Sequence, residues 1–157
     1  ALTSPNASRL NAQMERGART VEEELIALET GALDPADFPH REHVRLAFEM
    51  LGRYPFDEAL TRFLRGLRFL TAKAGKPELL HVTITVAFLA LIAERRATAH
   101  TLTWSDFIAA NADLLDKHVL EQWYSPEQLQ SELARTTFCL PEIRPASGPS
   151  AKAQDLA

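Results

Sequence analysis

The fold is decided by residues 78–97, which read ELLHVTITVAFLALIAERRA. As a helix, this stretch is apolar on nearly every side, and charged residues appear only at its end, as Glu94, Arg95 and Arg96. A helix without a polar face is usually buried between other elements. We therefore expect residues 78–97 to form the central helix of the protein. The expected core side chains of this helix are Phe88, Leu89, Leu91 and Ile92.

The segments on either side also predict helices. Residues 56–74 carry an apolar stripe at helical spacing, between Pro55 and the turn 75–77, and residues 39–52 form a second amphipathic pattern. Further helices are expected over about 21–30, 104–111, 114–124 and 126–138. No segment alternates apolar and polar residues as a half-buried strand does. The sequence predicts an all-α, single-domain bundle of six or seven helices around the helix 78–97.

Length and composition fit one folded domain with loose ends. The chain has 157 residues, of which 46% are hydrophobic and 24% charged, and a chain of this size buries most of its surface in one core. We expect residues 1–18 to be a loose N-terminal arm, 19–141 the helical domain and 142–157 a disordered tail. One cysteine, Cys139, excludes a disulfide framework.

Charge and hydropathy exclude several classes of partner. The net charge is −4 and no long basic stripe is present, so nucleic acid is not an expected partner. The longest apolar run, 82–93, is too short for a membrane span, and no signal peptide is evident, so we expect a cytoplasmic protein without membrane contact. The absence of a glycine-rich phosphate loop argues against a nucleotide cofactor. The sequence leaves open whether the chain forms a homo-oligomer.

The charges are unevenly distributed along the chain. Residues 1–37 hold seven acidic and three basic residues, whereas residues 41–76 hold eight basic and four acidic ones. Residues 102–135 hold six acidic and two basic residues, so a basic middle flanked by acidic ends predicts charge complementarity within the protein.

Three histidines are the candidate functional residues. His40 and His43 lie in the first turn of the helix 39–52, on its apolar face, and His81 lies in the first turn of the helix 78–97. The short turns around the helix 56–74 favour antiparallel neighbours, which would place both helix starts at the same end of the bundle. We therefore expect the three imidazoles to meet there.

Buried imidazoles need hydrogen-bond partners or a metal ion. The positive potential at helix N-termini keeps the rings neutral and able to bind a divalent ion, with zinc or iron as the candidates. The leading hypothesis is a metal-dependent enzyme acting on a small-molecule substrate, with His40, His43 and His81 as ligands. Hydrolysis, lyase and oxygen chemistry are not distinguished, and no catalytic residue is assigned. The candidate substrate-binding residues are Arg41, Thr85 and Tyr124.

Two other interpretations stay open. Without a metal, the same histidines would suit an anion, or one of them could act as a general base. Alternatively, the histidines are structural and the chain is a non-catalytic helical binding or adaptor protein, in which the basic face of the helix 56–74 contacts an acidic partner. Thr83 and Thr85 are expected to hydrogen-bond back to the carbonyl four residues earlier.

Three stretches together resemble a family of small uncharacterised bacterial proteins. They read FPHREHVRLAFEML (38–51), LLHVTIT (79–85) and WYSPEQLQSELARTTF (123–138). The resemblance covers about residues 38–141 and implies an all-helical protein without a named activity. It also implies that the histidines and the segment around Tyr124, Ser125 and Arg135 belong to one feature.

Overall fold

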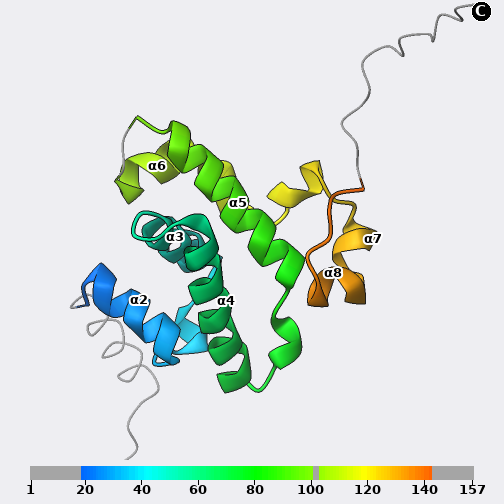
Figure 1. The fold of residues 1–157 in the computed structure, drawn as a ribbon, viewed down its shortest axis with the longest axis horizontal. Helices are drawn as coiled ribbons and strands as arrows, with labels where there is room; N and C mark the ends of the chain where they lie inside the picture. The colour runs from blue at the N-terminus through cyan, green and yellow to red at the C-terminus, as the bar shows by residue number, and fades with distance from the viewer. Residues whose placement is uncertain (1–18, 101–102, 143–157) are drawn as a thin grey trace, which may run out of the picture.

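The computed structural model describes residues 19–100 and 103–142. Within this part, the chain forms helices, turns and loops without a strand, which confirms the all-α, single-domain bundle (Figure 1). The α-helices are α2 (Val21–Thr30), α3 (His40–Leu51), α4 (Phe56–Lys73), α5 (Val82–Thr98), α6 (Trp104–Ala110), α7 (Pro126–Leu129) and α8 (Glu132–Thr136). Short 3-10 helices span Pro35–Asp37, Pro77–Leu79, Ala112–Leu115 and Val119–Gln122. The expected arm 1–18 and all but the first residue of the expected tail lie outside the described residues.

Helices α2 and α4 approach each other closely at a glycine. A Cβ atom on Gly66 would lie 2.5 Å from Cγ of Leu28 and 3.0 Å from the Leu28 carbonyl oxygen. Leu28 itself is fully buried. The missing side chain at position 66 therefore lets the backbones of the two helices touch.

Ion pairs join α2 to its neighbours, as the charge distribution predicted. Arg45 of α3 lies 2.7 Å from Glu24, and Arg62 of α4 lies 2.9 Å from Glu29. Glu29 of α2 thus pairs with part of the basic face of α4, and Glu24 pairs with α3.

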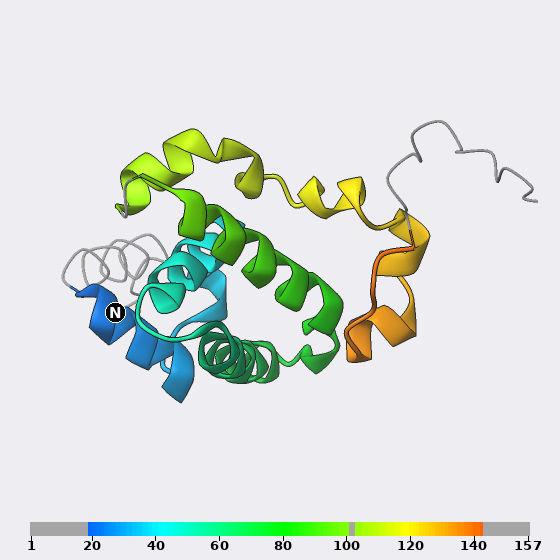
Figure 2. The same cartoon turned by 45° about the horizontal axis from the view of Figure 1, so that its top comes forward.

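The long helix α5 connects the two sides of the molecule. It packs against α3 and α4 on one side and α8 on the other (Figures 1 and 2). Phe88, Leu89 and Ile92 are buried as expected, but Leu91 is only half-buried, because it faces outward over a groove. The most completely buried helix is α3 rather than α5, with these side chains in the core: Val44, Leu46, Ala47, Phe48 and Met50.

The start of α5 differs from the prediction. Pro77–Leu79 forms a separate 3-10 helix, and His81 is extended, with φ −122° and ψ 106°. The helix expected over 78–97 therefore begins at Val82, and His81 is its N-cap rather than part of its first turn. In Figure 1, α3 is seen nearly end-on while α4 and α5 are seen from the side, so the helices cross instead of running antiparallel as expected.

The helix expected over 114–124 is broken into two 3-10 helices. Asp116 lies between them with an extended backbone, φ −82° and ψ 120°. Its Oδ1 atom accepts a hydrogen bond from the backbone N–H of His118 at 2.9 Å. Such a bond from a side chain to the nearby backbone competes with helix formation.

The helix expected over 126–138 is also interrupted. Ser131 ends the first part and caps the second, because its hydroxyl accepts a hydrogen bond from the N–H of Ala134 at 3.1 Å. The result is two short helices, α7 and α8, which stand beside the N-terminal half of α5 (Figures 1 and 2).

Residues 137–142, the C-terminal strap, return from α8 to α5. The Thr83 hydroxyl donates to the carbonyl of Thr137 at 2.7 Å and accepts from the N–H of Cys139 at 3.0 Å. The prediction that Thr83 bonds back within its own helix is therefore wrong. For Thr85 the prediction is confirmed, since its hydroxyl donates to the His81 carbonyl at 2.8 Å.

Among the described helices, none combines the length and apolar character that a membrane crossing requires.

Candidate functional site

A cavity of about 210 Å³ lies between α3, α4 and α5, beside the first turn of α3. Its polar lining groups are His40, His43, Thr85 and Lys117. The rest of the wall is apolar: Val44, Ala47, Phe63, Leu67, Ile84, Phe88, Leu89 and Ile92. An apolar cavity with a few converging polar groups is the usual form of a small-molecule site.

A second cavity of about 320 Å³ adjoins the first. Four residues line both cavities: His43, Leu67, Ile84 and Thr85. His81 lines the second cavity and not the first. The two cavities therefore share one wall, and His43 belongs to that wall.

His43 is held as a neutral imidazole. Its ring packs on Phe38, with centroids 4.3 Å apart. The pKa of His43 is lowered to about 4, chiefly by burial and also by the nearby His40 ring and Lys117, while a hydrogen bond with the Phe38 backbone and the charge of Glu42 act in the opposite direction. The hydrogen bond to the Phe38 backbone uses the one N–H of the neutral ring, so the other ring nitrogen is left as an acceptor for a ligand.

His40 is tied to another part of the chain. Its Nε2 atom donates to the carbonyl oxygen of Leu114 at 2.9 Å, because a carbonyl can only accept. The edge of the same ring meets Phe88, with centroids 5.1 Å apart. These contacts fix the position of the ring in the cavity wall.

His81 uses both ring nitrogens within the chain. Its Nδ1 atom accepts from the N–H of Ile84 at 3.1 Å, which caps α5, and its Nε2 atom donates to the carbonyl of Leu129 at 2.6 Å. The lone pair that a metal ion would need is therefore already occupied by the helix cap. His81 anchors α7 to the start of α5.

These contacts do not group the three histidines around one point. His40 and His43 line the first cavity, and His43 and His81 line the second. Across residues 19–100 and 103–142, no three His, Cys, Asp or Glu side chains are clustered as a metal ion requires. The three-ligand site stays a prediction from the sequence, and the side-chain arrangement does not support it.

No family model, curated protein or solved structure matches this chain. The resemblance to small bacterial all-helical proteins therefore stays a prediction. The functional argument rests on the cavity and on the residues that form it.

The three predicted substrate-binding residues are widely separated. Thr85 lines both cavities. Arg41 is exposed and lies over the ring of Trp104, 5.8 Å from its centroid, outside either cavity. Tyr124 is buried on the other side of α5 and donates its hydroxyl to the Cys139 carbonyl at 2.8 Å. Only Thr85 is thus in a position to meet a ligand beside His43.

Two residues of the site were not predicted from the sequence. Phe38 supplies the ring that covers His43, and Lys117 supplies a positive charge to the first cavity. Phe38 directly precedes Pro39, the N-cap of α3, so its place beside the start of this helix could have been inferred from the sequence. No pattern in the sequence indicates that Lys117 belongs to the site. Its segment was expected to be helical and is instead the loop between two 3-10 helices.

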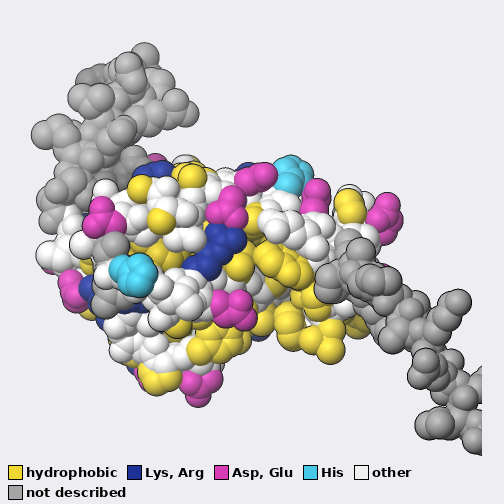
Figure 3. Space-filling view, turned by 90° about the horizontal axis from the view of Figure 1, so that it is seen from above, with side chains coloured by type: hydrophobic (Ala, Val, Ile, Leu, Met, Phe, Trp, Pro, Cys, Tyr) yellow, Lys and Arg dark blue, Asp and Glu magenta, His cyan; other side chains and the backbone are white. Residues whose placement is uncertain are grey.

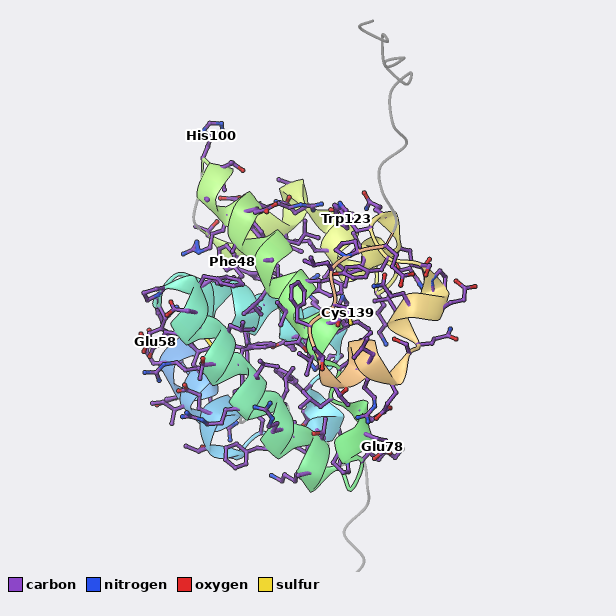
Figure 4. The ribbon with its side chains drawn as sticks, turned by 45° about the vertical axis from the view of Figure 1, so that its right-hand side comes forward. Phe48, Glu58, Glu78, His100, Trp123 and Cys139 are labelled. Carbon is purple, nitrogen blue, oxygen red and sulfur yellow. The ribbon has the colours of Figure 1, made fainter. Side chains whose placement is uncertain are left out.

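The outer face of α5 carries a different apolar surface. A groove of about 250 Å³ is lined by residues that include Leu91, Trp123 and Phe138. Figure 3 shows hydrophobic side chains gathered in a patch on the face seen from above. His100 projects from the far end of α5, away from Trp123 and Cys139 (Figure 4). None of the described residues that line the groove is a histidine, and the groove shares no lining residue with the two histidine-lined cavities.

Proposed function

We propose that this protein binds a small, largely apolar molecule in the cavity between α3, α4 and α5, with His43 as its hydrogen-bonding partner. The observation that carries the proposal is a neutral imidazole in the wall of an apolar cavity. The ring nitrogen that does not bond the Phe38 backbone is an acceptor, to which a ligand in the cavity can donate a hydrogen bond.

The size of the cavity supports a ligand of about six to eight carbon atoms. A dry protein cavity of about 150 Å³ is large enough to bind benzene. The cavity here has a volume of about 210 Å³, and it adjoins the second cavity across the wall formed by His43 and Thr85.

The chemistry available to the bound molecule is that of a neutral imidazole. With its pKa at about 4, His43 can accept a hydrogen bond at neutral pH, and it is a weak base. This favours binding over proton abstraction, because a general base works best with a pKa near the operating pH. Metal-dependent catalysis on a small molecule stays the alternative drawn from the sequence.

The adaptor interpretation is less favoured, because part of the basic face of α4 is already used. Arg62 pairs with Glu29 at 2.9 Å and with Glu58 at 2.7 Å. Lys73 donates to the carbonyl oxygens of Gly31 and Leu33. These contacts hold α2 on α4 and leave fewer charges for an acidic partner.

The proposal is tested by titrating the full chain with 1-hexanol and with hexanoate and following the NMR signals. We expect saturable shifts at residues of the cavity wall, such as Thr85 and Phe88. The variant Ile84→Trp puts a large side chain into the wall that both cavities share and should abolish binding while the helix content is kept.

Ala90→Trp is the matched control, since Ala90 lies on the same helix but lines the outer groove. It should bind both probes as the wild type does. If neither probe binds the wild type, or if Ile84→Trp binds as well as the wild type, the cavity is not a ligand site.

A further inference from the structure

One positive charge lies at the histidine-lined cavity. Lys117 is on the exposed loop between Ala112–Leu115 and Val119–Gln122, and it lines the cavity together with His40 and His43. Among the residues that the structure describes, no acidic side chain lines the cavity. The polar part of the wall is therefore complementary to a negative charge.

Two acidic residues of this environment already have partners within the chain. Asp116 accepts a hydrogen bond from the backbone N–H of His118 at 2.9 Å. Glu42, whose charge acts on His43, forms a salt bridge with Arg45 at 2.7 Å. Within the described residues, no carboxylate forms an ion pair with Lys117, so its ammonium group can pair with a ligand.

We propose that the ligand is a small monocarboxylate, with its apolar body in the cavity and its carboxylate paired with Lys117. The inference rests on the proposed function, because it specifies the ligand of the same site. A single lysine provides one charge and so matches a monoanion.

The apolar wall beside Lys117 strengthens the effect of its charge on a ligand. Salt and water screen an ion pair on an open surface, so such a pair contributes little to binding. Lys117 itself is exposed, but one side of its environment is the apolar cavity wall, which includes Ile84 and Phe88. The attraction between Lys117 and an anion should therefore exceed that of a fully exposed pair.

The test compares three six-carbon probes that differ in their head group: hexanoate, 1-hexanol and hexylammonium. Calorimetric titration of the full chain at low salt should give the tightest binding for hexanoate, by about fivefold over 1-hexanol. Hexylammonium should bind most weakly, because its charge has the same sign as that of Lys117. Added salt should reduce the preference for hexanoate.

The variant Lys117→Met removes the charge and keeps a side chain of similar length. It should bring hexanoate down to the affinity of 1-hexanol and leave 1-hexanol unchanged. Lys76→Met is the matched control, because Lys76 is exposed and lines neither cavity. It should keep the wild-type preference.

The outcomes separate this inference from the proposed function. If hexanoate and 1-hexanol bind equally well, or if Lys117→Met weakens both to the same extent, the carboxylate inference is wrong and the cavity still binds small molecules. If no probe binds, both proposals fail.

Discussion

At the scale of single residues, His43 shows how an apolar wall sets the charge of a side chain. The ring is covered by Phe38 and lines two cavities, and its pKa is lowered from 6.5 to about 4, chiefly by burial. Between these values, the unfolded chain binds a proton that the folded chain does not. The contribution of His43 to the free energy of unfolding is therefore fully present above the unfolded pKa. It is lost as the pH falls toward the folded pKa.

We expect this histidine to reduce the free energy of unfolding by about 2 kcal/mol between pH 7 and pH 5. Urea unfolding at several pH values measures the effect. His43→Leu removes the titrating group and should make stability less dependent on pH in this range.

The control is His118→Asn. This exposed ring pairs with Glu121 at 2.9 Å, which raises the pKa of His118 instead of lowering it. Its removal should not reduce the loss of stability at acid pH. An identical pH dependence in wild type and His43→Leu would show that His43 titrates as an exposed histidine does.

At the scale of elements, the contact of α2 with α4 depends on a single glycine. A Cβ at position 66 would come within 2.5 Å of Leu28 Cγ and within 3.0 Å of a backbone oxygen, which cannot move aside alone. Alanine in a helix is normally better than glycine by about 1 kcal/mol. Here we expect Gly66→Ala to be destabilising by about 1–3 kcal/mol, because overpacking outweighs helix propensity.

Thermal or urea unfolding of Gly66→Ala shows directly whether the substitution lowers or raises the free energy of unfolding. Gly52→Ala is the comparison, since its new methyl group would first meet the end of the Arg96 side chain, which can move. It should cost less than Gly66→Ala. A stabilised Gly66→Ala would mean that the two helices can separate without loss.

The helices that the sequence predicted best are those with local signals at their ends. Thr20 and Glu23 form a capping box at the start of α2, and Gly31 ends it with φ 76°. The breaks at Asp116 and Ser131 were missed, because a side chain that caps a new turn and one that sits inside a helix look alike in a sequence.

The same limit applies to the site. Helical spacing predicted that His43 lies on the apolar face of α3. A side chain on that face is expected to be buried, as His43 largely is. The partners of His40 and His81 are the backbone carbonyls of Leu114 and Leu129, from distant segments. Every residue has a backbone carbonyl, so the residue types in a sequence do not indicate which carbonyl a histidine will bond. A shared metal ion was therefore the hypothesis that the sequence favoured.

A second element-scale prediction concerns the C-terminal strap. Thr83→Val keeps the side-chain shape but removes the hydroxyl that bonds Thr137 and Cys139. Both backbone groups lose their partner, so we expect a loss of about 1–3 kcal/mol in the free energy of unfolding. Hydrogen exchange should also become faster at Cys139.

Thr85→Val is the matched control, because the carbonyl of His81 that its hydroxyl contacts also accepts the N–H of Thr85 at 3.1 Å. This variant should lose less stability. Equal losses in both variants would show that the strap does not depend on Thr83.

At the scale of the whole molecule, α5 packs against two units, the helical core with α3 and α4 and a smaller C-terminal unit with α8. One core contains side chains of α2, α3, α4 and α6, and a smaller cluster consists of Phe88, Val119, Leu120 and Tyr124. The C-terminal unit, defined here as residues 125–142, packs beside α5 (Figure 2). Its bonds to α5 come from His81 and Thr83, close to the start of that helix.

This arrangement makes His81 a link between the two units. Its ring holds the Leu129 carbonyl at 2.6 Å on one side and the Ile84 N–H at 3.1 Å on the other. We expect His81→Ala to remove both bonds and to speed hydrogen exchange in α7 and α8, while amides in the middle of α3 and α4 stay protected.

The same experiment separates an anchoring histidine from a metal ligand. An anchor acts through hydrogen bonds, so a chelator added to the wild type should leave the protection of α7 and α8 unchanged. If the chelator reproduced the effect of His81→Ala, the stability of this unit would depend on a bound ion, since only the folded chain could present its ligands together. His100→Ala serves as the control, because His100 is exposed at the opposite end of α5 and should leave exchange in α7 and α8 as it is (Figure 4).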